Sequence, residues 1–213
     1  MLPVAGATGR YLVELLDDEG VPHRQVAQGG GTRVNTSVLQ PGGVILKLNG
    51  PGSPLSSKQQ DELVDHVAAA VNDAIIGGRR TPLIWLAVCG SLPPETETGL
   101  VARLVAVALK AGARCAVDSW GEALAAALEA EADLAAPNRR ELAQVSRLVR
   151  EAAPGVKGIA EAAAALCHER GIELLVSLGS DGALWSNGQR TLHGTRPSLI
   201  LVNTSSIRPN VAN

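Results

Sequence analysis

The chain has 213 residues, of which 46% are hydrophobic and 19% are charged. This composition excludes a disordered protein and allows one substantial hydrophobic core. The formal net charge is −2 and Lys and Arg form no dense cluster, so a nucleic-acid partner is not expected.

The first quarter of the chain predicts one helix followed by short strands. A helix is expected at Thr8–Asp18, because Tyr11, Leu12, Leu15 and Leu16 recur at helical spacing. Three β-rich runs, separated by Gly and Pro, then predict a small antiparallel sheet that forms a lid or an edge subdomain. These runs are His23–Ala27, Val34–Leu39 and Val44–Leu48.

From Ser56 onward, helices alternate with apolar strands. Ser56 and Gln59 have the spacing of a capping box, and the helix that they begin extends to about Ile76. Strands are predicted at Leu83–Val88, Arg114–Val117, Leu134–Ala136, Glu173–Ser177 and Leu199–Val202, with a hairpin at Ala183–Trp185 and Thr191–His193. Helices are predicted at Gly99–Ala111, Glu122–Ala130, Arg140–Arg150 and Gly158–Arg170.

This alternation indicates an α/β fold with a mostly parallel central sheet. Strands that are apolar on both faces are typical of a sheet that helices cover on both sides. We therefore expect two parts in a single domain: a start helix with the β-lid at residues 1–55, and an α/β core at 56–213.

Candidate binding motifs follow the predicted strands, at the edge of the sheet where α/β enzymes bind ligands. Gly90 and Ser91 come directly after one strand, and Asp118 ends the next. Glycine lets backbone N–H groups approach a ligand, although a plain turn has the same local pattern. Asp118 could cap the following helix or line the cleft, and we expect it to cap the helix.

Asn138 and Glu141 open a helix after another strand and have two equally good interpretations. They fit an N-cap with an acid in the first turn of the helix. They also fit a Mg²⁺–phosphate site, because Mg²⁺ prefers oxygen ligands.

A glycine-rich turn, Ser177–Gly182, follows the last strand of the parallel set. Its backbone amides could hold a nucleotide, but Asp181 and Gly182 are also an ordinary turn pair. Arg33 precedes a lid strand and could form a bidentate contact with a phosphate. Asn49 ends the other lid strand, where it most simply makes a turn.

In order and spacing, these motifs resemble the 1-phosphofructokinases of the PfkB family of ribokinase-like sugar kinases. The resemblance extends from about residue 5 to Thr204. It rests on Gly6–Arg10, Thr32-Arg33, Asn49–Gly52, Gly90–Pro93, Asp118–Leu124, Pro137-Asn138 with Glu141, and Ser177–Gly182.

The resemblance implies a ribokinase-like three-layer sandwich with a small β lid. It implies phosphoryl transfer from ATP, with Mg²⁺, to fructose 1-phosphate, giving fructose 1,6-bisphosphate; tagatose 6-phosphate is the alternative substrate. The phosphosugar would be bound by Arg33, Asn49 and Ser91. The nucleotide would be bound by Asn138, Glu141, Ser177, Gly179, Asp181 and Gly182, with Asn138 and Glu141 serving the Mg²⁺. A homodimer through the lid strands is a further expectation.

The sequence also departs from the family pattern. The family's first strand, with its substrate-binding Asp and Gly-Gly loop, has no counterpart, so we expect a chain that is incomplete at both ends. Ala136 and Gly50 replace a common Lys and a usual Glu. After Thr204 the family has a glycine turn with the catalytic Asp, whereas this chain has Ser205–Pro209, and no Asp or Glu follows Asp181.

Three functional hypotheses follow. The first is a kinase relative with little or no turnover, because the loss of a positioned base costs roughly two to four orders of magnitude in rate. The second is a non-catalytic module that binds a nucleotide or a partner. The third is an active 1-phosphofructokinase in which Asp118 or Asp181 replaces the missing base. In each case, missing strands and helices would expose apolar surface and promote aggregation.

The remaining signals favour a cytoplasmic protein. Cys89, Cys115 and Cys167 are odd in number and widely spaced, as expected in a reducing compartment. We find no signal peptide and no apolar run of bilayer length, so no membrane partner is expected. The four histidines lack metal-ligand spacing, which argues against zinc.

Overall fold

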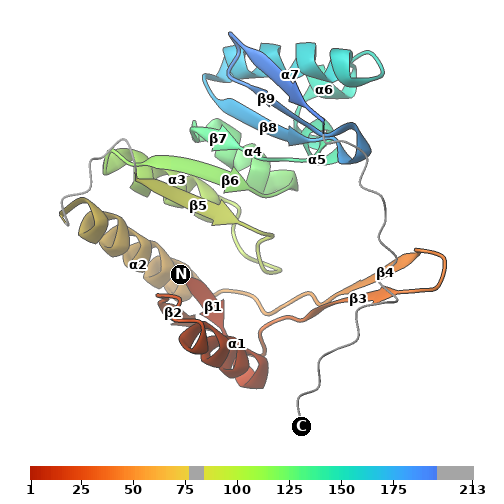
Figure 1. Cartoon of the computed structure of the whole chain (residues 1–213). Helices are drawn as coiled ribbons and strands as arrows, with labels where there is room; N and C mark the ends of the chain where they lie inside the picture. Colours follow the sequence, from red (N-terminus) through yellow and green to blue (C-terminus); the bar gives the residue numbers. More distant parts are fainter. Residues whose placement is uncertain (77–83, 196–213) are drawn as a thin grey trace.

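The computed structural model describes residues 1–76 and 84–195 (Figure 1). The predicted strand at Leu199–Val202 and the departures at Ser205–Pro209 lie outside these residues. The first elements are β1 (Leu2–Val4), α1 (Gly6–Asp18), β2 (Gln25–Ala27), β3 (Asn35–Leu39), β4 (Ile45–Asn49) and α2 (Ser57–Ile76).

The later elements make up the larger part of the fold. The strands are β5 (Trp85–Cys89), β6 (Arg114–Asp118), β7 (Leu134–Ala135), β8 (Glu173–Ser177), β9 (Ala183–Ser186) and β10 (Thr191–Gly194). The helices are α3 (Gly99–Lys110), α4 (Gly121–Glu129), α5 (Arg139–Val145), α6 (Arg147–Arg150) and α7 (Val156–Arg170), and a 3-10 turn, η2, spans Gly179–Asp181.

The described strands form three sheets. The largest has the order β10-β9-β8-β7-β6-β5, in which β5 to β8 are parallel and β9 and β10 are antiparallel. The other two are the parallel pair β1-β2 and the antiparallel pair β3-β4. The mostly parallel α/β sheet and the hairpin at its edge are therefore confirmed.

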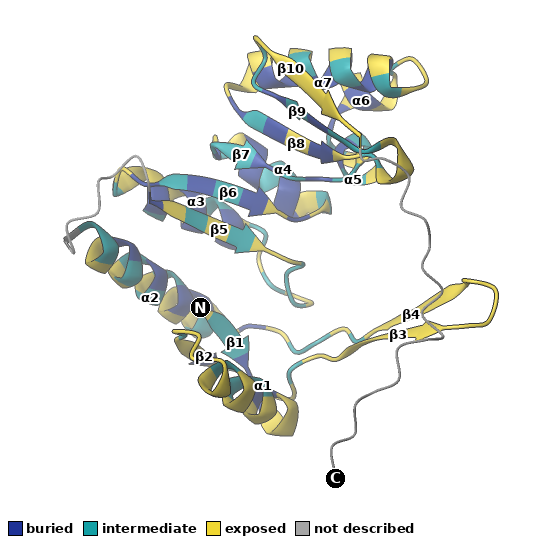
Figure 2. Ribbon diagram, in the orientation of Figure 1, coloured by how far each residue is buried: buried dark blue, intermediate teal, exposed yellow. Residues whose placement is uncertain are grey.

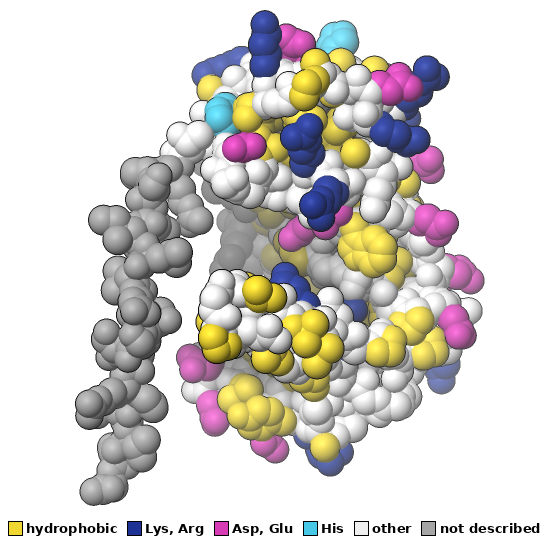
Figure 3. Space-filling view, turned by 90° about the vertical axis from the view of Figure 1, so that its right-hand side faces the viewer, with side chains coloured by type: hydrophobic (Ala, Val, Ile, Leu, Met, Phe, Trp, Pro, Cys, Tyr) yellow, Lys and Arg dark blue, Asp and Glu magenta, His cyan; other side chains and the backbone are white. Residues whose placement is uncertain are grey.

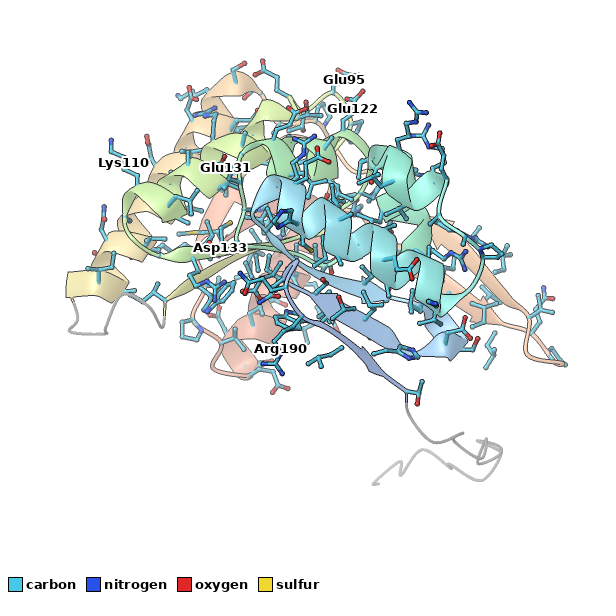
Figure 4. All side chains as sticks on the ribbon, turned by 90° about the horizontal axis from the view of Figure 1, so that it is seen from above. Glu95, Lys110, Glu122, Glu131, Asp133 and Arg190 are labelled. Carbon is cyan, nitrogen blue, oxygen red and sulfur yellow. The ribbon has the colours of Figure 1, made fainter. Side chains whose placement is uncertain are left out.

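The helices lie on opposite sides of the strands. Helices α2 to α7 form one layer, in which consecutive helices contact each other, and α1 lies on the other side (Figure 4). Right-handed crossovers explain this arrangement. From β5 to β8, each successive strand is added farther from the β1-β2 pair. From β1 to β2, the next strand is added in the opposite direction. A right-handed crossover therefore places α1 on the opposite face from the later helices.

One hydrophobic core runs beneath both parallel sheets. It joins Val26 of β2 and Val67 of α2 to Val105 of α3 and Cys115 of β6, all of them buried. A second core lies under β8 and β9, around Leu174 and other buried aliphatic side chains. The opposite face of the largest sheet is less covered among the described residues (Figure 2). Leu175 and Trp85, for example, are each 42% exposed.

Near the N-terminus one prediction was wrong and one strand was not predicted. The strand at Gln25–Ala27 does not belong to an antiparallel lid, because it pairs in parallel with β1. The strand β1 itself was not predicted. The signal was weak, since this strand has three residues and contains Pro3, which lacks the N–H of a regular ladder.

Two helix predictions also need correction. The helix expected at Arg140–Arg150 is divided, because Ser146 adopts an extended conformation and caps α6 through its hydroxyl, which accepts from Val149 N at 3.4 Å. Asp118 does not cap α4; the N-cap residue is Trp120, without a side-chain cap bond. The capping box at Ser56 and Gln59 is confirmed, with Ser56 N donating to Gln59 Oε1 at 2.9 Å.

The β3-β4 hairpin projects from the rest of the chain, and every residue of its two strands is exposed (Figures 1 and 2). Several of these residues are apolar: Val38, Leu39, Ile45, Leu46 and Leu48. Figure 3, which looks toward the hairpin, shows hydrophobic side chains on its surface. Across the described residues, no helix is both long and apolar enough to cross a membrane.

The buried thiol of Cys115 generates a prediction about reactivity. Burial raises the pKa of Cys115 to about 11, with a smaller contribution from Asp133. Cys89 is exposed. Because the thiolate is the reactive form, Cys89 should react with Ellman's reagent at pH 8 at least about 100-fold faster than Cys115. Stopped-flow traces of the native protein and of Cys89→Ser will measure this; an unchanged fast phase in Cys89→Ser would contradict it.

Candidate functional site

A pocket of about 220 Å³ lies at the carboxyl ends of β1, β2 and β5. In an α/β sheet the carboxyl edge at which the strand order reverses is the usual ligand site. This pocket lies at such a reversal, because successive strands are added in one direction from β5 to β8 and in the other direction from β1 to β2. Its lining includes Pro3, Gln28, Thr32, Arg33, Ser53 and Ser91.

Arg33 and Ser91 meet in this pocket, although 58 positions separate them in the sequence. Arg33 Nη1 donates a hydrogen bond to Ser91 Oγ at 2.6 Å. The guanidinium carries further N–H donors in a planar fork, the geometry that suits a phosphate. The structure thus brings together two of the three residues predicted to bind a phosphosugar.

Thr32 holds the Arg33 backbone against the turn between β1 and α1. Its Oγ1 accepts from Ala5 N at 2.8 Å, and its carbonyl accepts from Thr8 Oγ1 at 2.8 Å. Gly9 permits this close approach, because a Cβ there would lie 2.8 Å from Thr32 Oγ1. This role of Thr32 was not predicted, because the sequence alone does not show that Ala5 and Thr32 are neighbours in the fold.

Asn49, the third predicted phosphosugar residue, is not among the residues that line this pocket. It ends β4, opposite Asn35, and is exposed. Gln28, which was not predicted, does line the pocket, and its Oε1 is buried without a hydrogen-bond partner among the described residues. The substrate role of Asn49 stays a prediction.

The predicted nucleotide residues lie along the same edge of the sheet, at the ends of β7 and β8. Asn138 and Ser177 form a parallel bridge, and Ser177 N donates to the carbonyl of Pro137 at 3.1 Å. Two motifs that the sequence places about 40 positions apart are therefore adjacent.

Asn138 and Glu141 form a complete capping box. Asn138 Oδ1 accepts from the backbone N–H groups of Arg140 and Glu141 at 2.9 and 3.0 Å, and Glu141 Oε2 accepts from Asn138 N at 2.8 Å. The structural interpretation is therefore confirmed, while the nucleotide role stays a prediction. Asn138 Oδ1 already accepts two hydrogen bonds, whereas the cap uses only one of the two carboxylate oxygens of Glu141. Glu141 therefore fits Mg²⁺ better than Asn138 does.

The glycine-rich turn after β8 has a tight conformation. Leu178 N donates to the carbonyl of Gly182 at 2.8 Å, around η2. Gly182 has φ +92°, and a Cβ at this position would collide with the carbonyl of Gly194. The turn itself thus requires glycine, and the nucleotide roles of Ser177, Gly179, Asp181 and Gly182 stay predictions. Within the described ranges, no group of three or more His, Cys, Asp or Glu side chains could hold a metal.

Asp118 lies at the end of β6, opposite Cys89 in the ladder with β5. Its carbonyl accepts from Gly90 N at 2.8 Å, and Ser119 Oγ donates to the carbonyl of Gly90 at 3.0 Å. These two bonds fix the turn that carries Ser91.

Comparison with known proteins decides the family. The sequence profile of the "pfkB family carbohydrate kinase" matches residues 3–205. The chain belongs to the pfkB family. This confirms the resemblance that the motifs indicated.

Its pfkB relatives include two curated proteins that are named as phosphofructokinases. The ATP-dependent 6-phosphofructokinase isozyme 2 of Escherichia coli is 33% identical over 200 residues, which cover 92% of this chain and 60% of the relative. The 1-phosphofructokinase of Haloferax volcanii is 35% identical over 204 residues, which cover 94% of this chain and 60% of the relative. This pfkB chain therefore spans about 60% of the length of these two relatives.

Solved structures confirm the ribokinase-like fold. The E. coli phosphofructokinase-2 in complex with fructose-6-phosphate aligns with a TM-score of 0.79 at 31% identity, covering 93% of this chain and 62% of that one. The ribokinase of Arabidopsis thaliana aligns with a TM-score of 0.62 at 20% identity, covering 95% and 62%, a similarity that concerns the fold alone.

The capping box of this pfkB chain can be tested by substitution. Asn138→Ala removes the acceptor of two N–H groups and should lower the free energy of unfolding by about 1 kcal/mol, whereas Asn138→Ser should retain most of it. Urea denaturation followed by circular dichroism will compare the variants. Equal stability of Asn138→Ala and the parent chain would contradict the prediction.

Proposed function

We propose that this chain binds a fructose phosphate and ATP at the carboxyl edge of its parallel strands, with little or no phosphoryl transfer of its own. The proposal rests on the contact between Arg33 and Ser91, because it places a cationic fork and a hydroxyl in one pocket at that edge. The family reaction that we assign is the transfer of phosphate from ATP to fructose 1-phosphate. A tagatose 6-phosphate kinase is the alternative.

In this proposal Arg33 binds the phosphate already present on the sugar. Its N–H groups are suited to two phosphate oxygens at once, and Ser91 supplies a neutral donor beside it. Gln28 and Ser53 line the same pocket and offer polar groups to sugar hydroxyls. The names of the relatives, which act on fructose phosphates, support this class of ligand.

The nucleotide is proposed to bind along the edge formed by Asn138 and Ser177. The glycine-rich turn, Ser177–Gly182, would offer backbone N–H groups to phosphate oxygens, and Glu141 would hold Mg²⁺. When bound, Mg²⁺ neutralises charge on the transferred phosphate. The protein's own contribution is alignment of the two substrates.

Low turnover is proposed because Ser205–Pro209 stand where the family pattern has a glycine turn with the catalytic Asp, and no Asp or Glu occurs from 182 to 213. A base of this kind accounts for roughly two to four orders of magnitude in rate. Asp118 ends β6 and Asp181 lies in the turn after β8, so we propose these two as the carboxylates that could replace it.

We also propose a cytoplasmic homodimer that forms through the β3-β4 hairpin. An antiparallel pair with exposed apolar side chains on a projecting arm is suited to packing against a second copy. In this scheme residues 1–55 carry the dimerising lid, and residues 56–213 form the nucleotide-binding core.

The proposal predicts binding without normal turnover. Calorimetric titration of the purified chain should detect fructose 1-phosphate and, separately, MgATP. A coupled assay with both should give a kcat at least about 100-fold below the one per second typical of slower kinases. A kcat above one per second would refute the impaired activity, and the absence of heat with both ligands would refute the binding sites.

Arg33 should carry most of the phosphosugar affinity. Arg33→Met keeps the aliphatic stem but removes the charged hydrogen bonds, and we expect fructose 1-phosphate to bind at least about 10-fold more weakly. The exposed Arg24→Met provides a control, because Arg24 pairs with Asp73 and does not line this pocket. Equal affinity of Arg33→Met and the control would exclude the assigned role.

A further inference from the structure

The pocket that contains Arg33 and Ser91 also contains a buried acceptor without a partner. The side-chain oxygen Oε1 of Gln28 is buried and makes no hydrogen bond among the described residues. An unpaired buried acceptor is costly for a protein, because the group loses its hydrogen bonds with water and gains none in return. Buried polar groups are otherwise paired almost everywhere in native proteins, so an unpaired one at a pocket indicates that a ligand supplies the donor.

The backbone fixes the position of Gln28 relative to Arg33. Gln28 N donates to Val4 O at 3.1 Å, and Thr32 N donates to Ala5 O at 3.0 Å. The glycine loop that joins Gln28 to Thr32 is therefore anchored at both ends to adjacent residues at the end of β1. The buried oxygen of Gln28 and the guanidinium of Arg33 thus line one pocket from the two ends of a short, anchored loop.

The pocket offers donors at Arg33 and an acceptor at Gln28. Arg33 supplies N–H groups, and Ser91 Oγ, which accepts from Arg33 Nη1 at 2.6 Å, has an O–H of its own to donate. Phosphate oxygens are acceptors, so they fit these donors. Gln28 Oε1 is itself an acceptor and would repel a phosphate oxygen. The arrangement therefore suits a molecule that places a phosphate at Arg33 and a hydroxyl group at Gln28.

The size of the pocket limits where that hydroxyl can be on the ligand. The pocket has a volume of about 220 Å³, which is below the range of roughly 300 to 1,000 Å³ that is usual for ligand sites. A group at Gln28 must therefore lie close to the phosphate. The nearest carbon that can carry a hydroxyl is the neighbour of the phosphate-bearing carbon.

The candidate sugars differ at this carbon. In fructose 1-phosphate it is the anomeric carbon, which carries a free hydroxyl in both the furanose and the pyranose ring. In the furanose rings of fructose 6-phosphate and tagatose 6-phosphate it carries the ring oxygen, which has no proton to donate. The curated relatives include a 1-phosphofructokinase and a 6-phosphofructokinase by name, so membership of the family leaves the choice open.

We propose that Gln28 accepts a hydrogen bond from the anomeric hydroxyl of fructose 1-phosphate and thereby selects this sugar over fructose 6-phosphate and tagatose 6-phosphate. The inference rests on the phosphosugar binding proposed above and names the substrate of that site. With either 6-phosphate, a ring oxygen would face Gln28, and the buried acceptor would stay unpaired. A site built to bond a substrate hydroxyl discriminates strongly against an analogue that lacks it.

The first test changes the ligand and leaves the protein intact, so it does not depend on the folding of a variant. The analogue 2,5-anhydro-D-mannitol 1-phosphate is fructofuranose 1-phosphate without the anomeric hydroxyl. In calorimetric titrations of the full chain, fructose 1-phosphate should bind at least about 10-fold more tightly than this analogue and than fructose 6-phosphate. Equal affinity for fructose 1-phosphate and the analogue would overturn the role of Gln28.

The second test removes the acceptor from the protein. Gln28→Met keeps the length of the side chain and should weaken fructose 1-phosphate binding at least about 10-fold. The affinities for the analogue, for fructose 6-phosphate and for inorganic phosphate should change less than about 2-fold, because none of them donates to Gln28. Gln25→Met is the matched control, since Gln25 is an exposed glutamine at the start of β2 that does not line this pocket.

Inorganic phosphate separates this inference from the proposed function. If Arg33→Met weakens phosphate and fructose 1-phosphate while Gln28→Met behaves like Gln25→Met, the phosphosugar site stands and the role of Gln28 is wrong. If Gln28→Met weakens phosphate as much as fructose 1-phosphate, Gln28 acts on the phosphate or on the fold, and the specificity role is also wrong. If neither ligand binds the parent chain, both proposals fail.

Discussion

The right-handed crossover of parallel strands is the constraint on which the rest of this structure depends. Because of this crossover, the strands β5 to β8 are parallel, and the turns that follow them lie at one edge of the sheet. Because the chain steps in opposite directions from β5 to β6 and from β1 to β2, the helices divide between two faces. The pocket that holds Arg33 and Ser91 lies at that reversal, so its location follows from chain topology before any side chain is considered.

Several residues at this edge serve the fold and are also candidates for binding. Asn138 and Glu141 form a capping box, and Gly182 permits a turn in which a Cβ would collide with the carbonyl of Gly194. A structural role does not exclude a ligand, since a helix N-terminus and a tight glycine turn both present backbone N–H groups. It does mean that these motifs alone are weak signals of function. The contact between Arg33 and Ser91 is more informative, because it lies between distant segments.

The exposed parts of the chain have a common physical origin. A parallel strand is most stable when it has neighbours on both edges and helices on both faces. Among the described strands, β1 and β5 each pair along one edge only, and Trp85 and Leu175 are exposed on the less covered face. A second copy that packs against the hairpin, as proposed above, would reduce the exposed apolar surface of that hairpin.

The sequence alone was sufficient for the α/β class, most helices and strands, and the pfkB family, because alternating apolar runs and ordered motifs are local signals. It was insufficient where a strand is very short, as at Leu2–Val4, or where pairing decides the sheet, as for Gln25–Ala27. It offered two interpretations of Asn138 and Glu141, and the structure confirmed the cap. Only tertiary structure could bring Arg33 to Ser91, place Thr32 against Ala5 and bury Gln28 Oε1. These features depend on distances between remote segments, which local periodicity does not encode.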